Sequence, residues 1–172
     1  HANITTGPVI DESAWTRLKG LVDDAVAGGA TLLAGGERPT GMNAGHFLAP
    51  TVLAGVTETM AVYREETFGP IVSIVPFDDK TDLLRMANDC EEGGLTAYVF
   101  TRDLARAEHF SAHLRYGEIQ INGVKYDIDL PHGGIGQSGV GHDCSALALH
   151  DYLVQKRITR ALDTTTFGGL NP

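Results

Sequence analysis

Apolar positions recur at helical spacing near the start of the chain. Asp11 is typical of a helix N-cap, and apolar residues then follow three or four positions apart until Gly28-Gly29 ends the run: Trp15, Leu18, Val22, Ala25 and Val26. A short apolar segment over 31–34 comes next and leads into a glycine-rich loop. The pattern therefore predicts a helix between Asp11 and Gly28, followed by a short apolar stretch.

Strands and helices alternate from residue 71 to residue 122. The run from Ile71 to Phe77 suits a buried strand, and further strands are expected at 96–101 and 118–122. Between them, one helix over 81–92 has Leu84, Met86, Ala87 and Cys90 on its inward face, and another, capped by Asp103, has Leu104, Ala107, Phe110 and Leu114. This order predicts an α/β fold with a mainly parallel sheet and right-handed crossovers.

The chain changes character after Asn122. Residues 123–141 contain six glycines, which indicates a loop. A last helix is predicted from Asp143 to Leu153, a terminal strand over 156–162 and a tail over 164–172. We therefore divide the chain into a main part at 1–154, a C-terminal strand at 155–163 and a tail at 164–172.

Composition limits the classes of partner. Thirteen basic against 22 acidic residues give a net charge of -9, which argues against nucleic acid or an anionic membrane surface. No apolar run approaches the roughly 20 residues of a membrane span. Two cysteines far apart, outside any C-x-x-C pair, fit a reducing compartment, so we expect a cytoplasmic protein without a disulfide framework.

The glycine-rich loop contains a G-x-G-x-x-G pattern between Gly134 and Gly139. A phosphate-binding loop of that kind follows a strand directly and opens a helix, with an acidic residue about 20 positions further on. Here the preceding strand ends about a dozen residues earlier, at Asn122, and no such acidic residue follows. We therefore expect the pattern to be a coincidence.

The most informative motif is Tyr63-Arg64-Glu65-Glu66-Thr67-Phe68-Gly69-Pro70, directly before an apolar strand. A carboxylate can accept hydrogen bonds from both hydroxyls of a ribose, and a nearby aromatic ring can lie against a flat heterocycle. Four more motifs follow: Ala87-Asn88-Asp89, Val99-Phe100-Thr101-Arg102-Asp103, Asn122, and Pro131-His132-Gly133-Gly134 with Ser138-Gly139-Val140-Gly141. In order and spacing, the five motifs closely resemble the C-terminal part of the aldehyde dehydrogenase superfamily.

The resemblance covers almost the whole chain but only part of an enzyme. It implies that the main part, 1–154, is a partial catalytic domain of a three-layer α/β fold, in a parent protein that oxidises an aldehyde to a carboxylic acid with NAD or NADP. In that chemistry a cysteine attacks the aldehyde, hydride passes to the nicotinamide, and a base-activated water hydrolyses the thioester. The resemblance places the nucleophile, the base and most of the dinucleotide site outside this chain. We therefore expect a fragment with no catalytic residue, inactive by itself.

Several residues receive roles through the resemblance. Glu66 matches the ribose-binding glutamate and Phe68 the aromatic residue beside the nicotinamide. The loop after Asn122 corresponds to the variable loop that contacts the aldehyde, so the expected substrate-binding residues are Val124, Lys125, Tyr126 and His132. The terminal strand would join subunits into a homo-oligomer. A free-standing interaction module that pairs through this strand is the alternative.

Two departures from the family pattern bear on the site. His132 stands where the family usually has phenylalanine, which could favour a polar or acidic substrate. Lys125 could pair with a substrate carboxylate, or simply face water. A further departure, the extra residue in Glu92-Gly93-Gly94-Leu95, leaves the local packing there open.

Cysteine and histidine side chains suggest two other kinds of site. Cys144, in the first turn of the expected last helix and near His142, would have a thiol activated by the helix dipole, which leaves a cysteine-dependent acyl-transfer enzyme as a third hypothesis. Cys90 is expected to be a small buried hydrophobe. His109 and His113 share a helix face, but spacing alone supports a metal site, so we expect none.

Overall fold

The computed structural model describes residues 6–78, 82–89 and 93–160. Its α/β class is as predicted. In chain order the elements are α1 (Glu12–Ala27), β1 (Thr31–Ala34), β2 (Thr51–Ala54), α2 (Ala61–Arg64), β3 (Ile71–Ile74), α3 (Leu83–Asn88), β4 (Thr96–Val99), α4 (Leu104–His113), β5 (Glu118–Ile121), and the 3-10 helices η1 (Gly136–Ser138) and η2 (Ala146–Tyr152).

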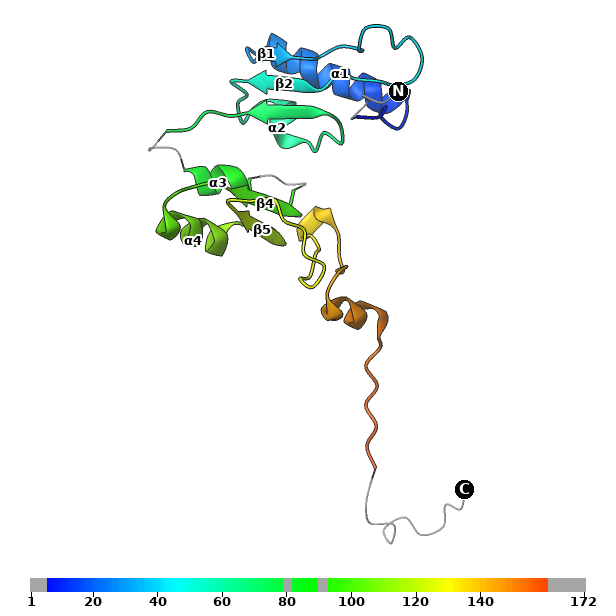
Figure 1. Ribbon diagram of the computed structural model, residues 1–172, viewed down its shortest axis with the longest axis vertical. Helices are drawn as coiled ribbons and strands as arrows, with labels where there is room; N and C mark the ends of the chain where they lie inside the picture. Colours follow the sequence, from blue (N-terminus) through cyan, green and yellow to red (C-terminus); the bar gives the residue numbers. More distant parts are fainter. Residues whose placement is uncertain (1–5, 79–81, 90–92, 161–172) are drawn as a thin grey trace.

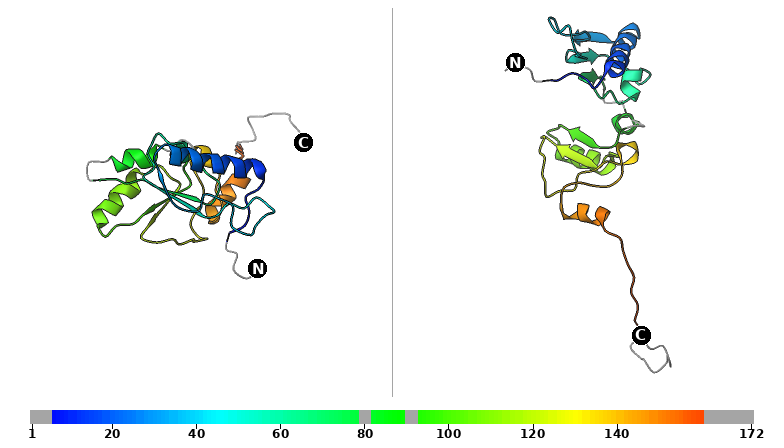
Figure 2. Two further views of the ribbon diagram at one scale, coloured as in Figure 1. Left: turned by 90° about the horizontal axis from the view of Figure 1, so that it is seen from above. Right: turned by 90° about the vertical axis from the view of Figure 1, so that its right-hand side faces the viewer.

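Helix α1 confirms the prediction made from its pattern and caps. The Asp11 carboxylate accepts a hydrogen bond from the Ala14 N–H at 2.7 Å, and Gly28 is the C-cap. The buried residues of the helix are Leu18, Leu21, Val22 and Ala25. They form one hydrophobic core with Leu53 of β2 and neighbouring buried residues, so α1 covers one face of the first sheet (Figures 1 and 2).

Substitution of Asp11 tests how much the N-cap hydrogen bond of α1 contributes to stability. Asp11→Ala removes the acceptor for the Ala14 N–H, and we expect the free energy of unfolding to fall by about 1 kcal/mol, the usual value for an N-cap. Urea unfolding followed by circular dichroism measures the change. Asp11→Asn keeps an acceptor oxygen and should restore most of the loss; equal losses in both variants would show that the cap bond contributes little.

The strands form two sheets in the part of the chain that the structure describes. In the first, β1 pairs antiparallel with β2, and β2 pairs parallel with β3, with Thr51 opposite Ile71. In the second, β4 and β5 are parallel, with Thr96 opposite Glu118. The sequence pattern predicts one sheet running from the 71–77 strand to the 118–122 strand. The division into two sheets was not predictable, because the order of strands in the chain does not fix which strands are neighbours in a sheet.

Two expectations about burial were wrong. Val72 and Ile74 of β3 are 59% and 46% exposed, because the alternate residues, Ile71 of the strand and Val75 just after it, are the ones that pack against the core. On α4 the Asp103 carboxylate caps the helix as predicted, and Ala107 is buried, but Leu104 is 71% exposed. Both faces carry apolar residues that the described residues leave exposed. Cys90 and the ends of the predicted 81–92 helix lie outside the described residues.

The C-terminal part also differs from the prediction. Cys144 and Ser145 have positive φ angles of 58° and 52°, so no helix starts at Asp143, and the last helical segment is the short η2. Residues 153–160 are exposed, form no strand, and run away from the rest of the chain (Figure 1). The remainder of the expected strand and the 164–172 tail lie outside the described residues. None of the described helices is long and apolar enough to cross a membrane.

Candidate functional site

The turn between α2 and β3 presents the two residues expected to bind the cofactor. Phe68 has a positive φ of 45° and is 80% exposed, an unusual placement for a phenylalanine. The next residue, Gly69, packs on α1 so closely that a Cβ at this position would lie 2.4 Å from Leu18 Cδ1. Since Leu18 is fully buried and has no room to move, position 69 requires a glycine. This close contact holds the turn against α1.

Arg17 of α1 braces the same turn. Its guanidinium donates hydrogen bonds to the backbone carbonyls of Thr67 at 2.6 Å and Glu66 at 3.4 Å. A fork of N–H donors is well suited to holding two successive carbonyls. Sequence analysis missed this residue because the contact joins positions 49 and 50 apart in the chain. Arg17 therefore helps to fix the position of the turn that carries Glu66 and Phe68.

Glu66 and Phe68 line one pocket of about 420 Å³, together with Arg17, Glu65 and Gln137. Gln137 comes from η1 in the glycine-rich loop, so the pocket brings together segments from both ends of the described chain. The pocket combines two carboxylates, a guanidinium, an amide and an exposed aromatic ring. Such a set can accept hydrogen bonds from sugar hydroxyls while a ring lies against a flat heterocycle.

The loop after β5 contains the four residues expected to contact the substrate. Val124 is 77% exposed, whereas the Lys125 ammonium lies 3.0 Å from the Asp127 carboxylate. The hydrogen bond from Lys125 lowers the pKa of Asp127, with a backbone N–H bond from Asp129 adding to the effect. The Lys125 backbone N–H donates to the side chain of Gln120 at 2.6 Å. The lysine is thus engaged by its own loop.

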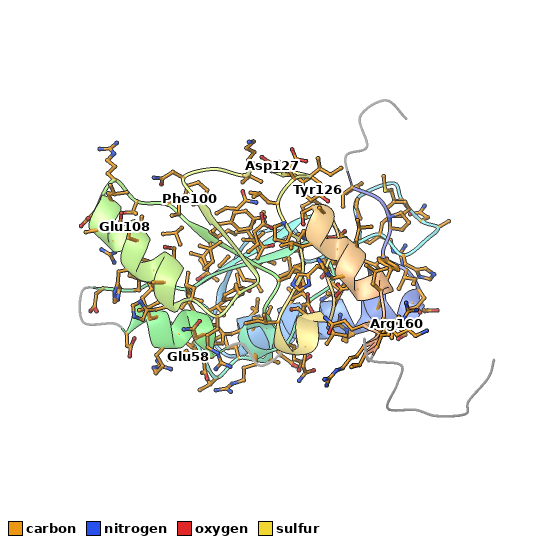
Figure 3. All side chains as sticks on the ribbon, turned by 90° about the horizontal axis from the view of Figure 1, so that it is seen from below. Glu58, Phe100, Glu108, Tyr126, Asp127 and Arg160 are labelled. Atoms are coloured by element: carbon orange, nitrogen blue, oxygen red, sulfur yellow. The ribbon has the colours of Figure 1, made fainter. Side chains whose placement is uncertain are left out.

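Tyr126 and His132 meet two residues from the segment that precedes η2. The Tyr126 hydroxyl lies 2.7 Å from Cys144 Sγ, and His132 Nδ1 lies 2.7 Å from Asp143 Oδ1. The two rings pack edge to face, with centroids 5.9 Å apart. The contact with Cys144 raises the pKa of Tyr126 to about 12. Tyr126 and Asp127 can be followed in Figure 3.

The sequence assigned Asp143 no role in a site, and it assigned Cys144 a different role, that of a thiol activated by a helix dipole. The expectation that a helix dipole activates Cys144 is wrong, because Cys144 lies before η2 in a left-handed turn. The only signal in the sequence was the placement of His132 and Asp143 on either side of a glycine-rich loop. Such a loop can bring its two ends together, but it does not specify which side chains meet.

The G-x-G-x-x-G pattern and the histidine pair were also singled out in the sequence. Between Gly134 and Gly139 the chain makes only the single-turn η1, so the G-x-G-x-x-G pattern opens no α-helix. The rings of His109 and His113 stack with centroids 4.5 Å apart, and His113 Nδ1 is bonded to the His109 carbonyl at 2.7 Å. In the described ranges, no group of three or more His, Cys, Asp or Glu side chains is placed to hold a metal ion.

A second hollow lies away from these residues. It has a volume of about 450 Å³ between α3, β4 and α4, and its lining is mostly apolar, with Phe77, Tyr98, Phe100, Phe110 and Tyr116 among the contributing residues. It contains none of the residues predicted to bind cofactor or substrate. The hollow reflects the uncovered face of the second sheet.

Comparison with known proteins agrees with the fold. The model of the aldehyde dehydrogenase family matches residues 1–158, and the chain belongs to this family. Aminoaldehyde dehydrogenase 1 of Pisum sativum, named as peroxisomal, is 34% identical over 167 residues, which are 96% of this chain and 33% of the relative. The chain thus spans about a third of the length of the relatives it matches.

Solved structures give the same result. The structure of succinate-semialdehyde dehydrogenase from Burkholderia pseudomallei is 39% identical, with a TM-score of 0.82, over 90% of this chain and 32% of that one. A Mycobacterium tuberculosis aldehyde dehydrogenase complexed with NAD+ is 36% identical, with a TM-score of 0.77, over 85% of this chain and 30% of that one. The predicted resemblance to the C-terminal part of this family is confirmed.

Proposed function

We propose that the full-length protein containing this chain oxidises an aldehyde to a carboxylic acid with NAD or NADP. The observation that carries the proposal is the braced turn that places Glu66 and Phe68 in one pocket with Arg17. Family membership and the NAD+ complex of the Mycobacterium relative support it. The nicotinamide cofactor would accept hydride from the substrate.

The residues of this chain would bind and orient rather than perform covalent chemistry. Glu66 would accept hydrogen bonds from the nicotinamide ribose, and the exposed ring of Phe68 would lie beside the nicotinamide. Val124, Lys125, Tyr126 and His132 would form the wall of the aldehyde site. The nucleophile and the base would come from other parts of the full-length protein.

Steady-state kinetics of the full-length protein tests this function. We expect NAD(P)H to form when the protein is mixed with NAD or NADP and an aldehyde, and the carboxylic acid to appear in equal amount. Omission of the aldehyde is the control. If a chemically diverse set of aliphatic and aromatic aldehydes gives neither product with either cofactor, the proposed function is wrong.

The C-terminal segment favours a second role, in assembly. Residues 153–160 are all exposed, and the apolar Val154 and Ile158 are 95% and 79% exposed. An extended chain with unpaired backbone groups can add to the edge of another sheet. We propose that this segment pairs with a second subunit of the full-length protein. A free-standing module that uses the same segment remains the alternative.

Deleting residues 155–172 from the full-length protein tests this assembly role. We expect a smaller oligomer in light scattering, because the deletion removes the backbone groups that would pair across the subunit boundary. Replacing Val154 and Ile158 by serine removes apolar area but keeps the backbone, so it should weaken the oligomer less. An unchanged mass after the deletion would rule out this interface.

The compartment is proposed on composition alone. The two cysteines, far apart and outside any C-x-x-C pair, fit the reducing cytoplasm. Since the pea relative is named as peroxisomal, family membership does not fix the compartment. We propose a cytoplasmic location for this protein, which fractionation of cells with an antibody against the chain would test.

A further inference from the structure

Two segments of the substrate loop close on each other. An antiparallel bridge joins His132 to Asp143 through backbone hydrogen bonds of 3.0 and 2.9 Å, and the Ser145 N–H donates to the Ile128 carbonyl at 2.7 Å. The side-chain pairs Tyr126–Cys144 and His132–Asp143 lie across the same junction. We call these four residues, Tyr126, His132, Asp143 and Cys144, the clasp.

The backbone is strained at Cys144 of the clasp and at the next residue, Ser145. Cys144 and Ser145 are successive non-glycine residues with positive φ, a conformation that costs free energy at each position. Such strain persists only where the surroundings over-determine the geometry, and here three backbone hydrogen bonds do so. The turn places Asp143 and Cys144 against the two aromatic residues of the loop.

The Asp143 contact selects the tautomer of the neutral His132 ring. A carboxylate only accepts hydrogen bonds, so Nδ1 carries the hydrogen in the 2.7 Å pair. In the neutral imidazole the other nitrogen, Nε2, is then a hydrogen-bond acceptor. A substrate group that donates a hydrogen bond can use this nitrogen, whereas a carboxylate on a substrate has no hydrogen to donate.

The charges of the surrounding loop point the same way. Residues 123–152 contain one lysine and four aspartates, a net charge of -3 with the histidines neutral. The lysine is already bound to Asp127. An anionic group would therefore meet a net negative charge in this loop, and the one lysine, although its side chain is 81% exposed, is paired with Asp127. This argues against the acidic substrate that His132 and Lys125 suggested in the sequence.

We propose that Asp143 and Cys144 are positioning residues that fix His132 and Tyr126, and that the site thereby selects a neutral aldehyde with a hydroxyl group at its far end. The inference rests on the proposed aldehyde oxidation and adds a substrate class to it. Family relatives are named for aldehydes of different charge, an aminoaldehyde and succinate semialdehyde among them, so the family itself does not determine this preference.

Matched aldehydes measure the preference in the full-length protein. Para-(hydroxymethyl)benzaldehyde, para-methylbenzaldehyde and para-carboxybenzaldehyde have similar shapes but offer a neutral donor, no donor and an anion. We expect the highest kcat/KM for the hydroxymethyl compound and the lowest for the carboxylate. Asp143→Ala should lower the ratio of kcat/KM values, hydroxymethyl to methyl, by about tenfold, or about 1.4 kcal/mol. The ratio does not depend on the fraction of folded enzyme, because both substrates use the same preparation.

A double-mutant cycle shows whether Asp143 acts through the imidazole. His132→Phe should lower the same ratio, and Asp143→Ala added to it should lower the ratio no further. Asp143→Asn keeps an acceptor oxygen and should retain more of the ratio than Asp143→Ala. Asp129→Asn removes an equal charge from the loop without touching His132, so it should leave the hydroxymethyl-to-methyl ratio nearly unchanged. Cys144→Ala should lower the ratio severalfold, and Cys144→Ser should lower it less.

The outcomes separate this inference from the proposed function. If no aldehyde is oxidised, the proposed function fails and the inference falls with it. If aldehydes are oxidised but the ratio in Asp143→Ala equals that of the wild type, only the role of the clasp is overturned. If the wild type prefers para-carboxybenzaldehyde and Lys125→Met abolishes that preference, the site selects an anion through Lys125 and the neutral substrate class is wrong.

Discussion

Replacing Glu66 by glutamine in the full-length protein is expected to lower kcat/KM for the cofactor by about tenfold or more. Glutamine keeps the shape of the side chain but removes the charge that strengthens hydrogen bonds to both ribose hydroxyls. A loss of that size corresponds to at least one contact of roughly 1.4 kcal/mol, and poor positioning of the nicotinamide would add to it. Initial rates at varied cofactor concentration measure the effect.

Glu65→Gln is the matched control for Glu66. Glu65 is the adjacent carboxylate and lines the same pocket. It is also the C-cap of α2, where its backbone N–H donates a hydrogen bond to the Ala61 carbonyl. Its side chain is assigned no contact with the ribose, so the variant should stay close to wild type. If Glu65→Gln loses the activity and Glu66→Gln does not, the ribose-binding carboxylate is Glu65.

Features set by short-range interactions were predictable from the sequence. The N-caps Asp11 and Asp103 each bond a backbone N–H three residues ahead, so the signal and its structural effect lie within one helical turn. The apolar spacing after Asp11 likewise predicted the buried face of α1, from Leu18 to Ala25. Glu66 and Phe68 were assigned through the family motif; both line one pocket, and their contact with a cofactor stays a prediction.

The structural features that were not predictable from the sequence depend on long-range contacts. Arg17 reaches carbonyls about 50 positions away, and no local pattern marks it. The pairing of His132 with Asp143 depends on a loop closure that exact backbone geometry decides, including two positive φ angles at residues that rarely adopt them. The missing helix start at Asp143 has the same origin, since composition alone favoured a helix from Asp143 to Leu153.

The purified chain by itself is expected to form no NAD(P)H from any aldehyde with either cofactor. Aldehyde oxidation through a thioester needs a thiolate and a base aligned with the bound nicotinamide. The described cysteine, Cys144, lies against the Tyr126 hydroxyl in the segment before η2, and the pocket lined by Glu66 and Phe68 contains no cysteine. The pocket of Glu66 and Phe68 would therefore bind at most part of a cofactor without a reaction partner.

Assaying the chain beside the full-length protein at equal concentration checks this expectation, with Cys144→Ser as a second sample. Serine can keep the hydrogen bond to Tyr126 but has no thiolate, so the variant separates a structural role of Cys144 from a chemical one. Turnover by the chain that disappears in Cys144→Ser would make Cys144 a nucleophile and restore the acyl-transfer hypothesis. Turnover by neither sample, with activity in the full-length protein, assigns the covalent chemistry to residues outside this chain.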